Sequence, residues 1–149
     1  MVDSKSATVA HNAAVARFRA ALPHDLKLRG DVAALEPLKE QHAADLGEAA
    51  ADGELWKLHF TSVPTIAGCA DYIATALQQR QEGTQLPFVV RRLSDGKIVG
   101  ATRFYAISAE NRNLSIGYTW YAKSAQRTAI NSECKLMLLK HAFESAGSI

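Results

Sequence analysis

The residues of this 149-residue chain that are best suited to chemistry lie between positions 114 and 146, where a polar loop joins an alternating segment to a helical one. Residues 114–121 alternate apolar with small or polar side chains, as a half-buried strand does. The loop that follows carries Lys123 and Arg127 and leads into a helix. Helix N-termini expose unpaired N–H groups and bind anions. The segment therefore predicts a site for a phosphate-bearing cofactor. Judged by composition alone, however, an ordinary hydrophilic loop before a helix is the favoured interpretation.

The helix after this loop is marked by apolar residues at helical spacing, beginning with Ile130, Cys134 and Leu138. Leu136, Leu139, Phe143 and Ala146 widen its apolar face, which predicts a deeply packed helix. Its charged residues have ordinary interpretations. Lys135 is expected to extend past the edge of the core, and Glu133 to be a charge in the first turn.

The strand, loop and helix together resemble the acetyl-CoA-binding core of the GNAT superfamily of N-acetyltransferases, most of all the branch that includes the ribosomal-protein N-terminal acetyltransferases. That family has a loop of the form Gln/Arg-x-x-Gly-x-Gly/Ala, which matches residues 126–131 here, with Ala129 and Asn131 at the usual glycine positions. The resemblance implies acetyl-CoA as the co-substrate. It places cofactor contacts at Tyr118, Thr119, Trp120, Gln126, Arg127, Thr128, Ala129, Ile130 and Asn131.

The remaining segments fit the same fold, which the resemblance implies to be α/β of the α+β type, with a mixed, mostly antiparallel sheet flanked by helices. Residues 28–38 are expected to form one strand, and the alanine-rich residues 39–51 a helix that Asp52-Gly53 ends. A second helix is predicted from Ser62 and Pro64 to Gly83. Strands are predicted over residues 87–93, 97–107 and 113–121, the first two joined by a Ser-Asp-Gly turn.

Residues 27–149 are thus expected to form a partial GNAT domain, and residues 1–26 an N-terminal extension with a helix over residues 8–22. In the family the long helix leads into another strand, a helix and two further strands. The resemblance therefore implies that the C-terminal strands are missing and that the chain is truncated. Strand 113–121 would then be an exposed edge through which a homodimer forms.

The reaction implied by the resemblance is transfer of an acetyl group to a primary amine, such as a protein N-terminal amine. Backbone N–H groups near residues 118–120 would polarise the thioester carbonyl. An α-amino group has a pKa near 8 and a lysine near 10.4, so an N-terminal amine costs about 3 kcal/mol less to deprotonate. The family's tyrosine acid lies beyond residue 149, and no catalytic residue is assigned. Glu110 is a weak candidate for the base, with a solvated turn glutamate as the ordinary interpretation.

Candidate substrate-binding residues lie before the first predicted hairpin and on strand 97–107. Trp56 and Phe60 are expected to line an acceptor groove or, equally, to pack in the core. Arg103 and Tyr105 alternate on one strand face. Arg103 is expected either to meet an acidic group of the acceptor or to form a surface ion pair.

Composition is that of an ordinary globular domain, with 48% apolar and 21% charged residues. A net charge of +2 gives no case for nucleic acid, and no apolar run approaches the roughly 20 residues of a membrane span. Cys69 and Cys134 are expected to be buried free thiols, which favours the cytoplasm. The histidines show no ligand spacing, so no metal site is predicted. The alternative function is an inactive GNAT-like module that binds a protein partner or self-associates through its open sheet edge.

Overall fold

The computed structural model describes residues 4–57 and 63–149, which form one antiparallel sheet with helices on both of its faces. The helices are α1 (Ser4–Ala20), α2 (Ala43–Ala51), α3 (Cys69–Gln81) and α4 (Ala129–Lys140), with a π turn at His141–Ser145. Short 3-10 turns are η1 (Glu40–His42), η2 (Leu55–Lys57) and η3 (Lys123–Ala125). The strands are β1 (Leu28–Arg29), β2 (Ala33–Pro37), β3 (Leu86–Arg92), β4 (Ile98–Ser108) and β5 (Asn113–Tyr121).

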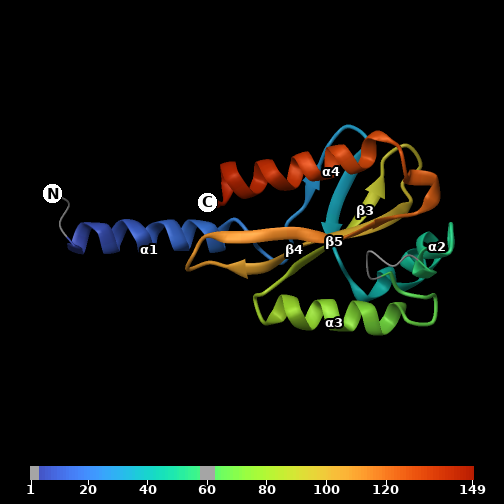
Figure 1. Ribbon diagram of the computed structural model, residues 1–149, viewed down its shortest axis with the longest axis horizontal. Coiled ribbons are helices and arrows are strands. Elements are labelled where there is room, and N and C mark those ends of the chain that lie inside the picture. The colour runs from blue at the N-terminus through green and yellow to red at the C-terminus, as the bar shows by residue number, and fades with distance from the viewer. Residues whose placement is uncertain (1–3, 58–62) are drawn as a thin grey trace.

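The five strands lie in sequence order, β1-β2-β3-β4-β5, and every neighbouring pair is antiparallel. Helix α4 lies across one face of the sheet, while α2 and α3 lie across the other (Figure 1). Helix α1 lies at one end and projects away from the body, although its Val15 and Phe18 are buried. Strand β5 is the last strand on its side of the described sheet, as the sequence predicts.

The predicted order of elements is confirmed, but the first strand is not continuous. Residues 28–38 form two strands, β1 and β2, joined by a tight turn in which the Gly30 N–H donates to the Ala33 carbonyl oxygen (2.9 Å). The prediction of one continuous strand was wrong, because apolar residues lie both before and after the turn and so suggest an uninterrupted strand. The turn is held by a residue of α4, described below.

The second predicted helix begins later than expected. Helix α3 starts at Cys69, and residues 65–68 form a separate turn in which the Gly68 N–H bonds to both the carbonyl and the hydroxyl oxygen of Thr65. The Thr65 hydroxyl competes with helix geometry at this point. Ser62, taken as the helix start, lies outside the described residues. Ile66 is exposed, whereas Cys69, Ile73 and Ala76 are buried, so the buried side of the helix begins only at Cys69.

The deep packing predicted for the last helix is wrong. Its buried residues repeat every fourth position, from Ile130 through Cys134 and Leu138 to Ala142. Of the four side chains that were expected to widen this face, Ala146 is buried, but Leu136, Leu139 and Phe143 remain exposed, at 58%, 45% and 59% of full exposure. A single helix lying on a sheet covers one stripe of its surface, and these three residues lie outside that stripe.

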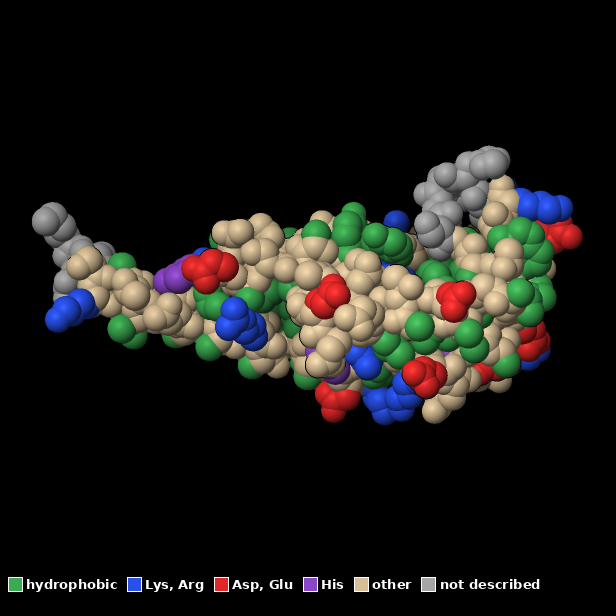
Figure 2. Space-filling view, turned by 90° about the horizontal axis from the view of Figure 1, so that it is seen from below, with side chains coloured by type: hydrophobic (Ala, Val, Ile, Leu, Met, Phe, Trp, Pro, Cys, Tyr) green, Lys and Arg blue, Asp and Glu red, His purple; other side chains and the backbone are tan. Residues whose placement is uncertain are grey.

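The core contains both cysteines, which are buried and free as predicted. In the described residues no helix is long and apolar enough to cross a membrane. The same residues contain no group of three or more His, Cys, Asp and Glu that would hold a metal ion. On the face seen in Figure 2, acidic and basic side chains are scattered and form no large patch of one sign.

Candidate functional site

Strand β5 carries a bulge at the end where it approaches the loop. Ala101 of β4 pairs with Trp120 and Arg103 pairs with Gly117, so two residues of β5 oppose the single residue Thr102. One of them, Tyr118, has a φ of 54°, a left-handed conformation that a bulge can impose. The bulge interrupts the regular ladder, and it changes the direction of the side chains along β5. The alternation that the sequence predicts is therefore broken at Tyr118.

A cavity of about 740 Å³ opens between the end of β5, the loop after it and the first turns of α4. Apolar side chains of Leu55, Ile116 and Trp120 form part of its wall. Two lysines, Lys123 and Lys135, lie on its rim, and no carboxylate is among its lining residues. The cavity thus combines an apolar surface with positive charge, which suits an anionic ligand that also carries an apolar part.

Four of the nine predicted cofactor residues line this cavity, namely Thr119, Trp120, Gln126 and Asn131. Six further lining residues were not among the predicted cofactor contacts. One of them, Lys135, could have been predicted, because it follows Asn131 by one helical turn and therefore lies on the same side of the helix. Lys123 was expected to add positive charge to the anion site, whereas no such expectation was made for Gly53, Leu55, Ile116 and Tyr121.

The predicted cofactor loop is a compact turn that leads directly into α4. Gln126 donates from its side-chain Nε2 to the Tyr121 carbonyl (2.9 Å), which folds the loop back on β5. Thr128 is the N-cap of α4. Its hydroxyl accepts from the Ile130 N–H (3.3 Å) and donates to the Ala125 carbonyl (2.6 Å). Arg127 is exposed and has a φ of 60°.

The positions where the family usually has glycine are helical here. Ala129 and Asn131 lie in the first turn of α4, where a Cβ is easily accommodated. The left-handed conformation falls on Arg127 instead. Ile130 is buried in the core, so only its backbone is available to a ligand. Thr128, Ala129 and Ile130 thus contribute the helix N-terminus, and they line a separate surface hollow beside Arg92.

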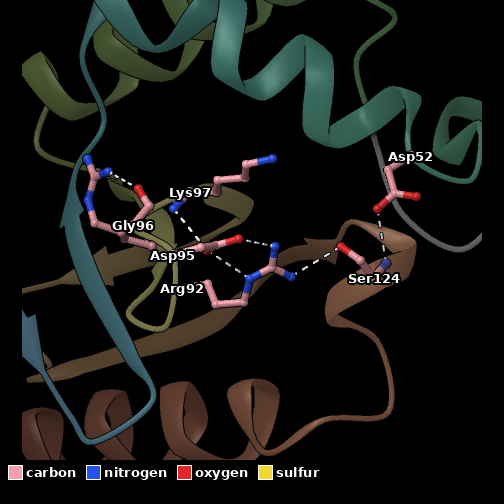
Figure 3. Close-up of polar contacts among 7 residues, drawn as sticks. Asp52, Arg92, Asp95, Gly96, Lys97 and Ser124 are labelled. Atoms are coloured by element: carbon pink, nitrogen blue, oxygen red, sulfur yellow. Dashed lines mark hydrogen bonds and ion pairs between the residues drawn. The ribbon is translucent and has the colours of Figure 1, made fainter.

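A polar network fastens this loop to the rest of the fold (Figure 3). The Ser124 N–H donates to Asp52 Oδ2 (3.0 Å), and the Ser124 hydroxyl accepts from the Arg92 guanidinium (3.2 Å). Arg92 also donates to both carboxylate oxygens of Asp95 (2.7 and 3.0 Å), which lowers the pKa of Asp95 to about 2. The backbone bond from Ser124 lowers the pKa of Asp52. The network ties the loop to the end of α2 and to the β3–β4 hairpin.

Glu133 fastens α4 to the opposite edge of the sheet. Its carboxylate accepts from three consecutive backbone N–H groups in the β1–β2 turn, those of Asp31 (2.6 Å), Val32 (2.8 Å) and Ala33 (2.8 Å). Burial acts to raise the pKa of Glu133, but the three bonds together lower it. The ordinary first-turn charge expected from the sequence is therefore a tertiary contact, and no local sequence signal shows it.

Arg103 is neither on the surface nor in an ion pair. It is 4% exposed and donates to Gln85 Oε1 (2.7 Å). Its guanidinium lies 4.4 Å from the ring centre of Tyr118 and 5.4 Å from that of Tyr72. No carboxylate of the described residues lies within ion-pair distance of it. The expectation of a surface pair is thus wrong, because the side chain turns inward between two aromatic rings.

None of the predicted substrate residues that the structure describes, Trp56, Arg103 and Tyr105, lines the cavity. Tyr105 packs its ring edge-on against Tyr118, with ring centres 5.2 Å apart. Trp56 is half-buried against the core, and Phe60 lies outside the described residues. Glu110 is exposed in the β4–β5 turn, where it bonds to His11 Nε2 (2.9 Å). The structure does not bring Glu110 to the cavity, which lies at the other end of β5.

The chain belongs to the GNAT acetyltransferases, because the family model described as acetyltransferase (GNAT) domain matches residues 33–148. Solved structures show the same fold. A GCN5-related N-acetyltransferase from Brucella melitensis is 22% identical, with a TM-score of 0.71 over 85% of this chain and 58% of that one. The Salmonella typhimurium acetyl transferase that modifies the N-terminal serine of ribosomal protein L7/L12 is 18% identical, with a TM-score of 0.69 over 83% of this chain and 71% of that one.

A third similar structure is the microcin C7 self-immunity acetyltransferase MccE in complex with acetyl-CoA and AMP. It is 20% identical, with a TM-score of 0.65 over 80% of this chain and 67% of that one. No curated protein sequence matches the chain. The chain thus spans 58% to 71% of the length of these three proteins. The comparisons do not confirm the predicted truncation.

Proposed function

We propose that the cavity beside β5 binds acetyl-CoA and that the chain takes part in transferring its acetyl group to a primary amine. The observation that carries this proposal is the lining of the cavity, which has two lysines and no carboxylate around an apolar wall. Coenzyme A has that combination, with phosphates at one end and an uncharged arm at the other. Family membership and the acetyl-CoA bound to MccE support the proposal.

Different residues of the site would contact different parts of acetyl-CoA. Lys123 and Lys135 would attract the phosphates, as would the N-terminus of α4 at Thr128–Ile130. Thr119 and Trp120 line the part of the cavity next to the bulge in β5. Backbone N–H groups near Tyr118, where the bulge changes the course of β5, would polarise a thioester carbonyl.

The acceptor would approach from the side of the aromatic cluster around Tyr118. A base first takes a proton from the ammonium, the neutral amine nitrogen then attacks the thioester carbonyl, and the carbon–sulfur bond breaks so that the thiolate leaves and takes up the second proton that the nitrogen loses. An α-amino group needs the weaker base, because its pKa lies near 8. We therefore propose a protein N-terminal amine as the acceptor, with Arg103, Tyr105 and Trp56 nearby. The base and the acid of the reaction remain unassigned.

Calorimetric titration with acetyl-CoA tests this proposal, with desulfo-CoA as a ligand that cannot be turned over. We expect micromolar binding, and a loss of about threefold in affinity in Lys123→Ala or Lys135→Ala, because partly exposed charge pairs contribute up to about 1 kcal/mol. Lys97→Ala is the matched control, since Lys97 is an exposed lysine that lines another hollow. Equal losses in all three variants, or no binding by the folded wild type, would contradict the proposal.

A second candidate function is self-association or the binding of a protein partner through the edge of β5. It is favoured by the exposed side chains of Leu136 and Leu139 on α4 and of Phe143 in the π turn after it, together with the position of β5 at the edge of the described sheet. Light scattering over a range of concentrations tests it, and a strictly monomeric chain would count against it. A cytoplasmic location is part of the proposal and is supported by the two free thiols.

A further inference from the structure

Arg103 of β4 is a buried cation that forms no ion pair with any carboxylate of the described residues. Its side chain is 4% exposed, and its hydrogen-bond acceptors are the neutral amide oxygens of Gln85 (2.7 Å) and Gln79 (3.5 Å). Burying a charge without a counter-ion costs free energy, and well-packed apolar side chains often fill such a place equally well. Stability therefore does not explain an arginine at this position.

The contacts of Arg103 lead to the bulge of β5. Its guanidinium carbon lies 4.4 Å from the ring centre of Tyr118 and 5.4 Å from that of Tyr72. Tyr118 is the residue with the left-handed φ of 54°, and Tyr105 adds an edge-on contact to its ring (5.2 Å). Because a Cβ makes the left-handed conformation unfavourable, a residue such as Tyr118 keeps it only where its surroundings hold it.

The two residues that follow the left-handed one are also held by groups outside β5. The Trp120 indole donates from Nε1 to the hydroxyl of Tyr72 (3.4 Å), whose ring is the second one beside Arg103. Between them, the hydroxyl of Thr119 shares a hydrogen bond with that of Thr102 (2.8 Å). Arg103 thus contacts the start of the bulge directly and reaches its end through Tyr72.

We propose that Arg103 is a positioning residue for acetyl transfer, which keeps Tyr118 left-handed and so aims the backbone N–H groups of the bulge at the thioester carbonyl. The inference rests on the proposed function, which assigns that carbonyl to these N–H groups. A guanidinium suits the task because it is flat and charged, so it can stack on two aromatic rings at once. Arg103 itself makes no contact with the ligand.

The first part of the test needs no ligand. Nuclear magnetic resonance of the free chain measures the three-bond coupling between the N–H and Hα protons of Tyr118, which reports its φ. We expect this coupling to change in Arg103→Met, with shifted or broadened amide signals for residues 118–120. It should change less in Arg103→Lys, which keeps the charge but loses the flat face. Arg19→Met, at an exposed arginine of α1, is the matched control and should leave these signals as in wild type.

The second part measures acetyl transfer from acetyl-CoA to a peptide with a free N-terminal amine, through the free thiol that is released. Because the N–H donors are displaced rather than removed, kcat should fall by about ten- to a hundredfold in Arg103→Met. The KM for acetyl-CoA should stay within about threefold of wild type, since this contact strengthens in the transition state. Arg19→Met should change neither constant.

A further variant separates positioning from simple packing. Glycine adopts a left-handed φ readily, so in a Tyr118→Gly background the bulge no longer depends on a ring held by Arg103. Adding Arg103→Met to Tyr118→Gly should therefore change kcat by less than about threefold. A role confined to packing would instead lower the melting temperature of Arg103→Met and leave kcat per folded molecule unchanged, which would overturn the proposal.

The inference and the proposed function can fail separately. If the Tyr118 coupling is the same in Arg103→Met as in wild type, Arg103 does not hold the bulge, and the inference is overturned while the proposed function stands. A coupling that changes without a fall in kcat would also overturn it, because the bulge would then not aim the reacting groups. If folded wild type transfers no acetyl group, the proposed function fails and the role of Arg103 in transfer fails with it.

Discussion

The two ends of β5 differ in how completely their polar groups are satisfied. At the hairpin end, Arg112 accepts from the N–H of Ile149 (2.9 Å) and from the hydroxyl of Ser148 (3.1 Å), and Glu110 bonds to His11 of α1 (2.9 Å). At the cavity end, the buried Tyr121 hydroxyl has no nitrogen or oxygen partner among the described residues, and the backbone is bulged. The hairpin end is thus held by hydrogen bonds between elements, whereas the other end opens onto the cavity.

The cavity end also depends more on distant parts of the chain. Gly100 of β4 lets β5 approach closely, Asp52 holds the loop, and Glu133 holds α4 to the sheet. The contacts at the hairpin end come from its own turn, from α1 and from the C-terminal residues of the chain. This difference indicates that the cavity is supported by the whole domain. Substitutions of Gly100, Glu133 and Asp52 should therefore lower the free energy of unfolding by different amounts.

The largest effect is expected at Gly100. This buried glycine pairs with Tyr121, and an added Cβ would meet the backbone oxygen of Trp120, which cannot move unless β5 moves. Gly100→Ala should therefore lower the free energy of unfolding by about 3 kcal/mol, as overpacking in a core does. Urea denaturation measures this loss.

Gly117→Ala, in the middle of β5, is the control. Its Cβ would lie 2.7 Å from Cε1 of Tyr105, a side chain that can rotate away, so a loss of about 1 kcal/mol is expected. His11→Ala, at the hairpin end, should cost less than about 0.5 kcal/mol because the pair is exposed. If His11→Ala were as damaging as Gly100→Ala, the two ends would not differ as we describe.

An intermediate effect is expected at Glu133. Glu133→Ala leaves three N–H groups of the β1–β2 turn without an acceptor, and we expect a loss of about 2 kcal/mol, since bonds to charged groups are strong but these are partly exposed. A Cβ at Gly30 would collide with the Glu133 carboxylate. Gly30→Ala should therefore cost about 1 kcal/mol in wild type and almost nothing in the Glu133→Ala background. A cost that is the same in both backgrounds would show that Gly30 acts independently of Glu133.

The strands that the sequence predicts well are those with local signals. β3, β4 and β5 begin and end within about one residue of their predicted limits, because alternation and the Ser94–Gly96 turn define them. The β1–β2 turn was missed because the carboxylate that holds it comes from a residue about 100 positions later. The exposure of Leu136 and Phe143 was missed because a helical pattern shows which residues are apolar, not what covers them.

The residues of the candidate site also differ in how well the sequence predicts them. The position of the cavity follows from the strand, loop and helix, and Asn131 was predicted by resemblance. Tyr121 was not predicted, since a buried hydroxyl without a nitrogen or oxygen partner is a property of packing and has no pattern in the sequence. The buried position of Arg103 was missed for a related reason, because its aromatic neighbours Tyr72 and Tyr118 are distant in the sequence.

The smallest effect is expected where the loop is tied to α2. Asp52→Asn should lower the free energy of unfolding by about 0.5 kcal/mol at pH 6, because its contact with Ser124 lies near the surface. The pKa of Asp52 is lowered in the folded state, so its contribution is complete above the ordinary value of 3.8 and disappears as the pH falls through the lower, folded pKa. The difference between wild type and Asp52→Asn should therefore vanish in strong acid. Asp25→Asn, a change at an exposed carboxylate outside the network, is the control. A difference that persists in strong acid would mean that the carboxylate charge does not hold the loop, and that the cavity end relies on Gly100 and Glu133 alone.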